Sequence, residues 1–154
     1  KNMLHSLHKK QLVKCNITEL WNFISDPANL ATITPPEMNF KVHTDLKNKK
    51  MHPGQIIEYT VSPLLGLSMH WVTEITHVKH EEFFVDEQRF GPYTFWHHQH
   101  SIKETPYGIE MHDDIHYKIP MGPLGRLVNK LFISNKLERI FEYRKKKLDE
   151  LFPN

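Results

Sequence analysis

The residues best suited to chemistry are histidines in the segment FWHHQHSI, residues 95–102, whose remaining composition is typical of a β-strand. Successive side chains of a strand point to opposite faces. One face of this segment therefore carries Trp96, His98, His100 and Ile102. Because an imidazole titrates near neutral pH, it can transfer a proton, pair with a carboxylate or bind a metal. The pattern predicts two imidazoles on a largely apolar, inward face.

Two aspartates on the neighbouring predicted strands are expected to point the same way. The inward residues of those strands are Phe84, Asp86 and Gln88 on one, and Met111, Asp113, Ile115 and Tyr117 on the other. Folding the two hairpins at FGP and TPYG places Asp86 near His98, and Asp113 near His100 or His98. A buried carboxylate needs a partner, and an imidazole can supply one.

The group formed by Asp86, His98, His100 and Asp113 admits several roles. Its members can satisfy one another as a structural network, form the polar end of a ligand pocket, or act as a general acid–base pair. The spacing of His98 and His100 also allows them to chelate Zn²⁺ together with a carboxylate. Because the pattern is short and the chain has 12 histidines, we predict no metal and no cofactor.

The composition indicates one ordinary globular domain over residues 1–154. Hydrophobic residues make up 39% and charged residues 25% of the chain, which are common values for globular proteins. A formal net charge of +2 gives no reason to expect a nucleic-acid partner. Two short basic runs, residues 47–50 and the run from Arg144 to Lys147, are interpreted as a solvated turn and a solvated helix face.

Three features of the sequence bear on the cellular location of the protein. Cys15 is the only cysteine, so the chain forms no internal disulfide and has no CxxC redox or metal motif. No apolar run approaches the roughly 18–20 residues of a membrane span. The first ten residues, KNMLHSLHKK, do not resemble a signal peptide. We therefore expect no membrane span and a cytoplasmic location.

Hydrophobic periodicity predicts the elements that position these side chains. A first strand is expected over residues 4–13, followed by an amphipathic helix over 17–24 that Asn16 and Glu19 cap, and by a short helix beginning at Pro27. Six further strands are expected near residues 40–46, 55–62, 68–77, 82–89, 94–103 and 109–119. In the strand at 68–77 the expected inward residues are Met69, Trp71, Thr73 and Ile75.

The last thirty residues return to the helical period between Pro123 and Pro153. The apolar stripe of this helix consists of Leu124, Leu127, Val128, Leu131, Leu137, Phe141, Leu148 and Leu151. A curved antiparallel sheet needs a cover for its apolar face, and this stripe is suited to provide it. The order of elements therefore predicts an α+β fold in which a sheet wraps around one long helix, with a cavity between them.

Four segments resemble the SRPBCC superfamily, which includes the START, Bet v 1-like and polyketide cyclase/dehydrase-like proteins. They are LWNFISDPANLATITPPEMNF, FFVDEQRFGPYTFWHHQHSI, MHDDIHYKIPMGPLG and IFEYRKKKLDELF. The resemblance implies a helix-grip fold, with a seven-stranded antiparallel sheet around a long C-terminal helix and a cavity for hydrophobic ligands. It is strongest toward an uncharacterised bacterial ligand-binding branch. The Cys and His ligands of the Rieske-type members are missing, and fold alone assigns no reaction.

The favoured hypothesis is a binding protein for a hydrophobic small molecule of lipid, polyketide or aromatic type, acting as a monomer or weak homodimer. The expected walls of its cavity are Tyr59, Trp71, Phe84, Trp96, Met111 and Tyr117. The expected polar end consists of Asp86, Gln88, His98, His100 and Asp113. The alternative is a cyclase-, dehydratase- or hydrolase-like enzyme in which His98 or His100 acts as general base, held by Asp86 or Asp113. A third hypothesis is a regulatory protein that binds a partner through the C-terminal helix.

Overall fold

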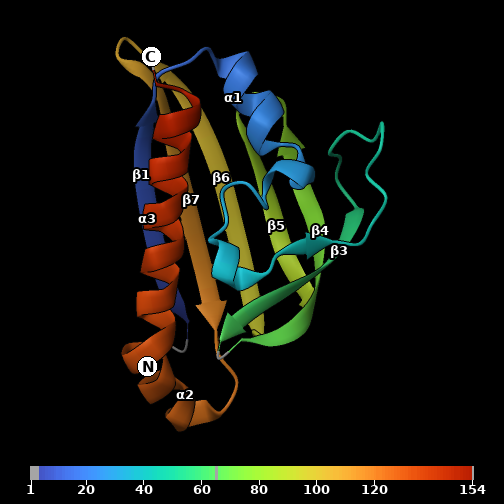
Figure 1. Ribbon diagram of the computed structural model, residues 1–154, viewed down its shortest axis with the longest axis vertical. Coiled ribbons are helices and arrows are strands. Elements are labelled where there is room, and N and C mark those ends of the chain that lie inside the picture. The colour runs from blue at the N-terminus through green and yellow to red at the C-terminus, as the bar shows by residue number, and fades with distance from the viewer. Residues whose placement is uncertain (1–3, 65, 154) are drawn as a thin grey trace.

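The computed structural model describes residues 4–64 and 66–153, and its dominant element is one antiparallel sheet (Figure 1). Within the described residues the sheet has seven strands, in the order β1-β7-β6-β5-β4-β3-β2. Their bounds are β1 His5–Val13, β2 Lys41–Val42, β3 Gln55–Leu64, β4 Leu67–Lys79, β5 Phe83–Phe90, β6 Phe95–Thr105 and β7 Gly108–Lys118. The strands that carry the histidines and aspartates are thus direct neighbours at the centre of the sheet.

The first helix, α1 (Ile17–Ile24), forms as the sequence predicts. The side chain of Asn16 accepts a hydrogen bond from the backbone N–H of Glu19, and the Glu19 carboxylate accepts one from the N–H of Asn16. This reciprocal cap satisfies two N–H groups that have no partner within the helix. Leu20 and Trp21 are buried in the core.

The second predicted helix is a single 3₁₀ turn, η1 (Pro27–Asn29), which Asp26 caps by accepting a hydrogen bond from the N–H of Ala28. Another turn, η2 (Pro36–Met38), follows. Strand β2 comes next and contains two residues instead of the seven expected over 40–46. Together these segments form an irregular stretch of chain that crosses in front of the sheet between α1 and β3 (Figure 1).

The C-terminal region forms α2 (Gly122–Val128), a π-helical turn η3 (Asn129–Ile133) and α3 (Ser134–Leu151). Figure 1 shows α3 lying along the sheet beside β1, which it contacts, while α2 lies beyond the strand ends. Leu137, Phe141 and Leu148 of α3 are buried. Among the described residues, no helix is sufficiently long and apolar to cross a membrane.

Two predicted orientations are wrong. Four leucines of the helical stripe expected to cover the sheet are 44–56% exposed: Leu124, Leu127, Leu131 and Leu151. The first three precede or lie within the π-helical turn, where the chain extends past the sheet, so no strand covers them. Met69, expected to point inward, is 39% exposed. Because β4 pairs with β5 only from Val72 onward, Met69 lies on the free end of the β3–β4 hairpin.

Candidate functional site

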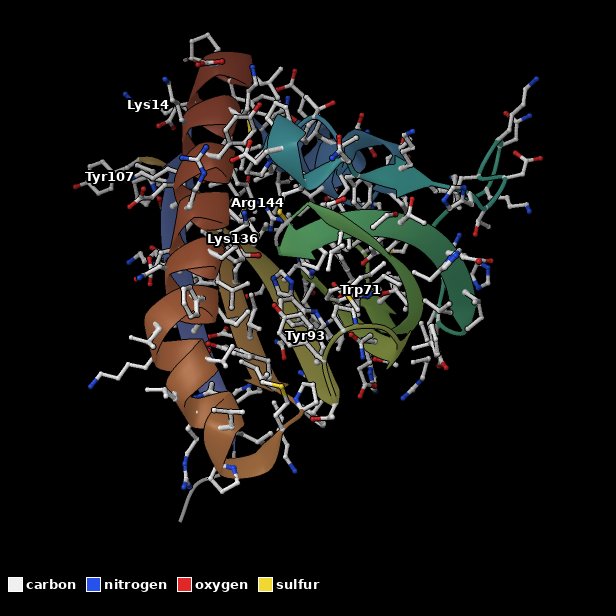
Figure 2. All side chains as sticks on the ribbon, turned by 60° about the horizontal axis from the view of Figure 1, so that its bottom comes forward. Lys14, Trp71, Tyr93, Tyr107, Lys136 and Arg144 are labelled. Carbon is white, nitrogen blue, oxygen red and sulfur yellow. The ribbon has the colours of Figure 1, made fainter. Side chains whose placement is uncertain are left out.

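A cavity of about 170 Å³ lies between the sheet, α3 and the loop that contains η1 and η2. Figure 2 shows its two sides, with Lys136 and Arg144 on α3 facing Trp71 of β4 and Tyr93 of the β5–β6 turn. Most of the wall is apolar or aromatic, and its residues include Ile33, Met38, Phe40, Ile57, Tyr59, Val61, Trp71, Phe84, Trp96, Met111, Leu137, Ile140 and Phe141. The sheet, the helix and the loop all contribute, so the cavity depends on the complete fold.

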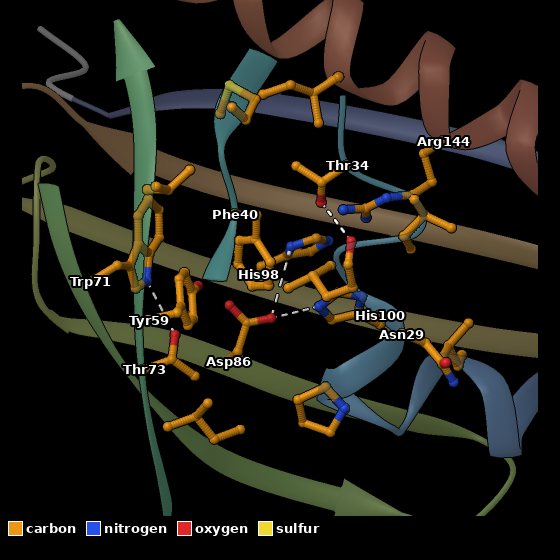
Figure 3. A pocket seen from close by; sticks show the side chains of 18 of the residues that line it. Asn29, Thr34, Phe40, Tyr59, Trp71, Thr73, Asp86, His98, His100 and Arg144 are labelled. Atoms are coloured by element: carbon orange, nitrogen blue, oxygen red, sulfur yellow. Dashed lines mark hydrogen bonds and ion pairs between the residues drawn. The ribbon is translucent and has the colours of Figure 1, made fainter. Parts of the chain in front are cut away.

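The polar side of this cavity is built by strand pairing. In the register of the sheet, His98 lies opposite Asp86 and His100 lies opposite Asp113. The hydrogen bonds run diagonally: His98 Nε2 is 2.7 Å from Asp113 Oδ1, and His100 Nε2 is 2.5 Å from Asp86 Oδ2. Figure 3 shows the contacts between Asp86 and the two imidazoles. The predicted proximity of these four residues is confirmed.

The two imidazoles are stacked face to face. Their ring centroids are 3.6 Å apart with an interplanar angle of 23°, and Phe84 continues the stack at 4.0 Å from His100. The indole N–H of Trp96 donates to Asp86 Oδ1 at 3.3 Å. Aromatic rings thus cover faces of the imidazole pair, while one nitrogen of each imidazole, Nε2, is hydrogen-bonded to a carboxylate.

Arg144 joins the same group from α3. Its side chain is only 9% exposed, and its Nη1 lies 3.6 Å from Asp113 Oδ1. The guanidinium also lies over the ring of Phe141, 4.7 Å from the ring centre. The interpretation of Arg144 as part of a solvated helix face is therefore wrong. Asp86, His98, His100, Asp113 and Arg144 are called the buried cluster below.

A signal for Arg144 was present in the sequence. Arg144 follows Leu137 and Phe141 and precedes Leu148 at spacings of four, three and four residues, which place all four on one helix face. Three lysines follow Arg144 directly, and such a basic run is typical of an exposed helix face. An arginine is rarely buried unless it has a partner. The partner, Asp113, lies on a strand more than twenty residues earlier in the chain.

Burial and charge act in opposite directions on the pKa values of the buried cluster. Burial tends to raise the pKa of both carboxyl groups, but the hydrogen bonds and charges of the imidazoles outweigh it, and both pKa values are lowered. Burial and the charge of His100 lower the pKa of His98. Burial opposes protonation of His100 as well, yet its hydrogen bonds to Asp113 and Asp86 raise its pKa.

These directions define a charge state. With both aspartates ionised, Arg144 charged, His100 protonated and His98 neutral, the charges of the buried cluster sum to zero. A second proton on His98 would put two positive rings in stacking contact, which is unfavourable at low effective dielectric. We therefore expect the imidazole pair to carry a single positive charge, on His100, at pH values between the lowered pKa of His98 and the raised pKa of His100.

Eight of the eleven predicted ligand-binding residues line the cavity, and they are Tyr59, Trp71, Phe84, Asp86, Trp96, His98, His100 and Met111. The other three have different surroundings. Asp113 lies against the two imidazoles and Arg144. Gln88 bridges the β5–β6 turn, donating to the carbonyl of Tyr93 and accepting from its N–H. The Tyr117 hydroxyl donates to Asn129.

Further lining residues were not predicted as part of the site. They include Asp26, Asn29, Thr34, Phe40, Tyr93, Lys136 and Ile140. Those in the loop over residues 26–40 have no periodic pattern that indicates their orientation. Thr73 also lines the cavity, and it lies on the inward face that alternation predicts for β4. Its hydroxyl accepts a hydrogen bond from the indole of Trp71 at 3.2 Å.

Asp86, His98 and His100 are the described residues that could together hold a metal ion, since one ligand atom from each lies within 4.8 Å of the others. A metal lies close to the plane of each imidazole that binds it. Because the two rings are stacked, their planes do not meet near the nitrogens, and joint chelation would require one ring to rotate. Such a rotation would break an imidazole–carboxylate hydrogen bond. The absence of a metal stays a prediction.

The sheet, the C-terminal helix and the cavity between them define the helix-grip fold. Solved structures support this assignment. A START superfamily protein from Mycobacterium smegmatis is 14% identical, with a TM-score of 0.69 over 96% of this chain and 98% of that chain. Protein CV1439 from Chromobacterium violaceum is 13% identical, with a TM-score of 0.72 over 97% and 98% of the two chains.

A plant protein is also similar. The major latex-like protein 151 from Panax ginseng is 14% identical, with a TM-score of 0.60 over 90% of this chain and 97% of that chain. No protein-family model and no curated protein sequence matches the chain. At these identities the likeness shows the fold alone, and at that level the predicted fold class and the resemblance to SRPBCC proteins are confirmed.

Proposed function

We propose that the protein binds a mostly apolar small molecule that carries at least one oxygen function. The observation that carries this proposal is a cavity whose walls are mostly apolar or aromatic and which most of the ionisable side chains of the buried cluster also line. Pockets of this composition are typical of small-molecule sites, where apolar area supplies affinity and a few polar groups fix orientation.

The volume of the cavity favours a small ligand. An engineered protein cavity of about 150 Å³ is large enough to bind benzene, and the cavity here measures about 170 Å³. A single aromatic ring or a short acyl chain therefore fits between the walls as they stand. Among the lipid, polyketide and aromatic ligands that the resemblance implies, this size favours the one-ring aromatic compounds.

Direct titration with small probes tests the proposal. Toluene and phenol are titrated into the protein, and binding is followed by calorimetry and by NMR shifts of side chains in the cavity. Val61→Phe fills the cavity, because Val61 is buried and lines it. Val72→Phe, on the opposite face of the sheet, is the matched control. We expect binding by the wild type and Val72→Phe, and loss of binding in Val61→Phe. If neither probe binds the wild type, the proposal is wrong.

One observation favours an enzyme as the second candidate. The stacked imidazoles have pKa values displaced in opposite directions, so one ring is suited to accept a proton while the other holds one. Such a pair could exchange the α-proton of a ketone bound in the cavity. Deuterium exchange into acetophenone is measured by NMR for the wild type, His98→Ala and His100→Ala. Equal exchange in all three proteins would remove this candidate.

A further inference from the structure

We infer that the ligand of the cavity is an anion whose carboxylate is bound by Arg144. This inference rests on the proposed function and specifies its ligand class. Arg144 lines the cavity, and its residue is 7% exposed. Its Nε is buried and has no hydrogen-bond partner within the described residues. Figure 3 shows the side chain reaching from α3 toward the centre of the site.

The guanidinium has a charge partner but too few acceptors. Asp113 Oδ1 lies 3.6 Å from Nη1, beyond ordinary hydrogen-bond distance, and the same oxygen is 2.7 Å from His98 Nε2. A guanidinium has five N–H donors and stays protonated in proteins. Buried donors without acceptors are unfavourable. Arg144 is thus held in place by charge while its donors remain available to an oxygen ligand.

Other groups near Arg144 do not supply the missing acceptor. The hydroxyl of Thr34 donates to the carbonyl of Leu30 at 2.6 Å. Asp86 is engaged by His100 and Trp96. Among the described residues, none bonds to Arg144 Nε, and the contact of Nη1 with Asp113 is 3.6 Å long.

The distribution of charged groups around the cavity favours binding of an anion next to α3. Lys136 precedes Arg144 by two helical turns and lines the same cavity. The two carboxylates that line the cavity, Asp26 and Asp86, already have partners of their own. Asp26 caps η1, and Asp86 pairs with His100. A planar carboxylate matches the fork of a guanidinium, which can bind both of its oxygens at once. An aromatic carboxylate would place its ring against the apolar wall and its oxygens toward Arg144.

Two isosteric ligands test this inference. Benzoate and nitrobenzene have the same shape, but only benzoate carries a full negative charge. Their dissociation constants are measured by calorimetry for the wild type, Arg144→Met, Arg144→Lys and the control Lys146→Met, which removes an exposed charge from the outer face of α3. We expect the wild type and Lys146→Met to bind benzoate more tightly than nitrobenzene.

Arg144→Met should weaken benzoate binding by about tenfold to a hundredfold, the range for hydrogen bonds to charged groups, and should leave nitrobenzene binding nearly unchanged. Arg144→Lys should give an intermediate affinity for benzoate. Equal affinity of the wild type for both ligands, or benzoate binding that is the same in Arg144→Met, would overturn the inference.

The outcomes also separate this inference from the proposed function. If nitrobenzene binds and benzoate does not, the cavity is a ligand site and only the anion inference fails. If neither ligand binds the wild type, the proposed function fails as well. Should Arg144→Met not fold, as judged by circular dichroism, the wild-type comparison and Arg144→Lys still decide the question.

Discussion

Replacing Asp113 by asparagine tests the charge state of the buried cluster. Asp113 Oδ1 lies 2.7 Å from His98 Nε2, 3.4 Å from His100 Nδ1 and 3.6 Å from Arg144 Nη1. Asparagine has nearly the same shape but no charge. In the variant, a protonated His100 and Arg144 would share a single negative partner, Asp86, so the cluster would carry a surplus positive charge. We therefore expect a loss of stability and a lower pKa for His100.

The loss should depend on pH. At pH 6, where His100 is protonated in the wild type, the substitution breaks a buried ion pair, and such changes cost about 3–5 kcal/mol of unfolding free energy. Once the pH has risen through the folded pKa of His100 and this ring is neutral, the wild-type cluster has a surplus negative charge that asparagine removes. Only hydrogen bonds to Asp113 are then lost, at a cost of about 1–3 kcal/mol.

The direction of this effect follows from the pKa of His100, which the fold raises above its value of about 6.5 in the unfolded chain. The stability that its proton provides is fully present below that unfolded value and is lost as the pH rises through the folded pKa. The pKa of Asp113 is lowered in the fold, so its own contribution is lost only in acid and is constant between pH 6 and pH 9.

Urea denaturation of the wild type and Asp113→Asn at pH 6 and pH 9 measures the free energies of unfolding, and NMR titration of the imidazole protons measures the pKa values. Asp114→Asn is the matched control, because Asp114 is the next residue of β7, points outward and pairs with the exposed His8. An exposed pair contributes about 0–1 kcal/mol. An equal loss at both pH values for Asp113→Asn, with unchanged titration curves, would refute the proposed charge state.

Three further predictions follow from the same structure. Leu148→Ala should cost about 2–5 kcal/mol of unfolding free energy, as for other buried leucines, whereas Leu124→Ala should cost nearly nothing; urea denaturation of both tests the division of the C-terminal stripe. Benzoate should bind with uptake of up to one proton, because its negative charge favours conversion of neutral His98 to the imidazolium form. Calorimetry in two buffers with different heats of ionisation measures this uptake. Gln88→Ala should cost about 1 kcal/mol, because it removes both hydrogen bonds to the half-buried backbone of Tyr93, and Gln88→Glu should restore only the bond to the N–H. Thermal denaturation compares the two variants.

The central strands could be predicted from the sequence because their information is local. Alternation places Asp86, His98 and Asp113 on one face, and tight connections at FGP and TPYG leave few choices of pairing. The capped helix α1 was predictable for the same reason, since Asn16 and Glu19 lie only three residues apart. In both cases the signal and the structure that it specifies occupy one short stretch of chain.

Features that depend on distant contacts could not be predicted in this way. The burial of Arg144 depends on Asp113, which approaches it only when α3 packs on the sheet. The exposure of Leu124 and Leu127 depends on where the strands end relative to the helix, and on a π-helical turn at residues 129–133 that has no periodic signature. Thr34 lines the cavity only because the loop that carries it packs against the rest of the fold, and no local pattern in the sequence indicates this position.

The diagonal bonds between His98 and Asp113, and between His100 and Asp86, have a consequence for folding. A slip of two residues between central strands preserves the alternation of faces, so hydrophobic patterning alone penalises it weakly. If β7 slipped against β6, Asp113 would lie opposite Ile102 or His98 instead of His100, and the diagonal bond between Asp113 and His98 would lose its geometry. A slip of β5 against β6 would likewise displace Asp86 from His100. Desolvated charges without partners are far costlier than mismatched apolar side chains. We therefore expect these ion pairs to select the native alignment of β5, β6 and β7 among alignments that the apolar residues tolerate.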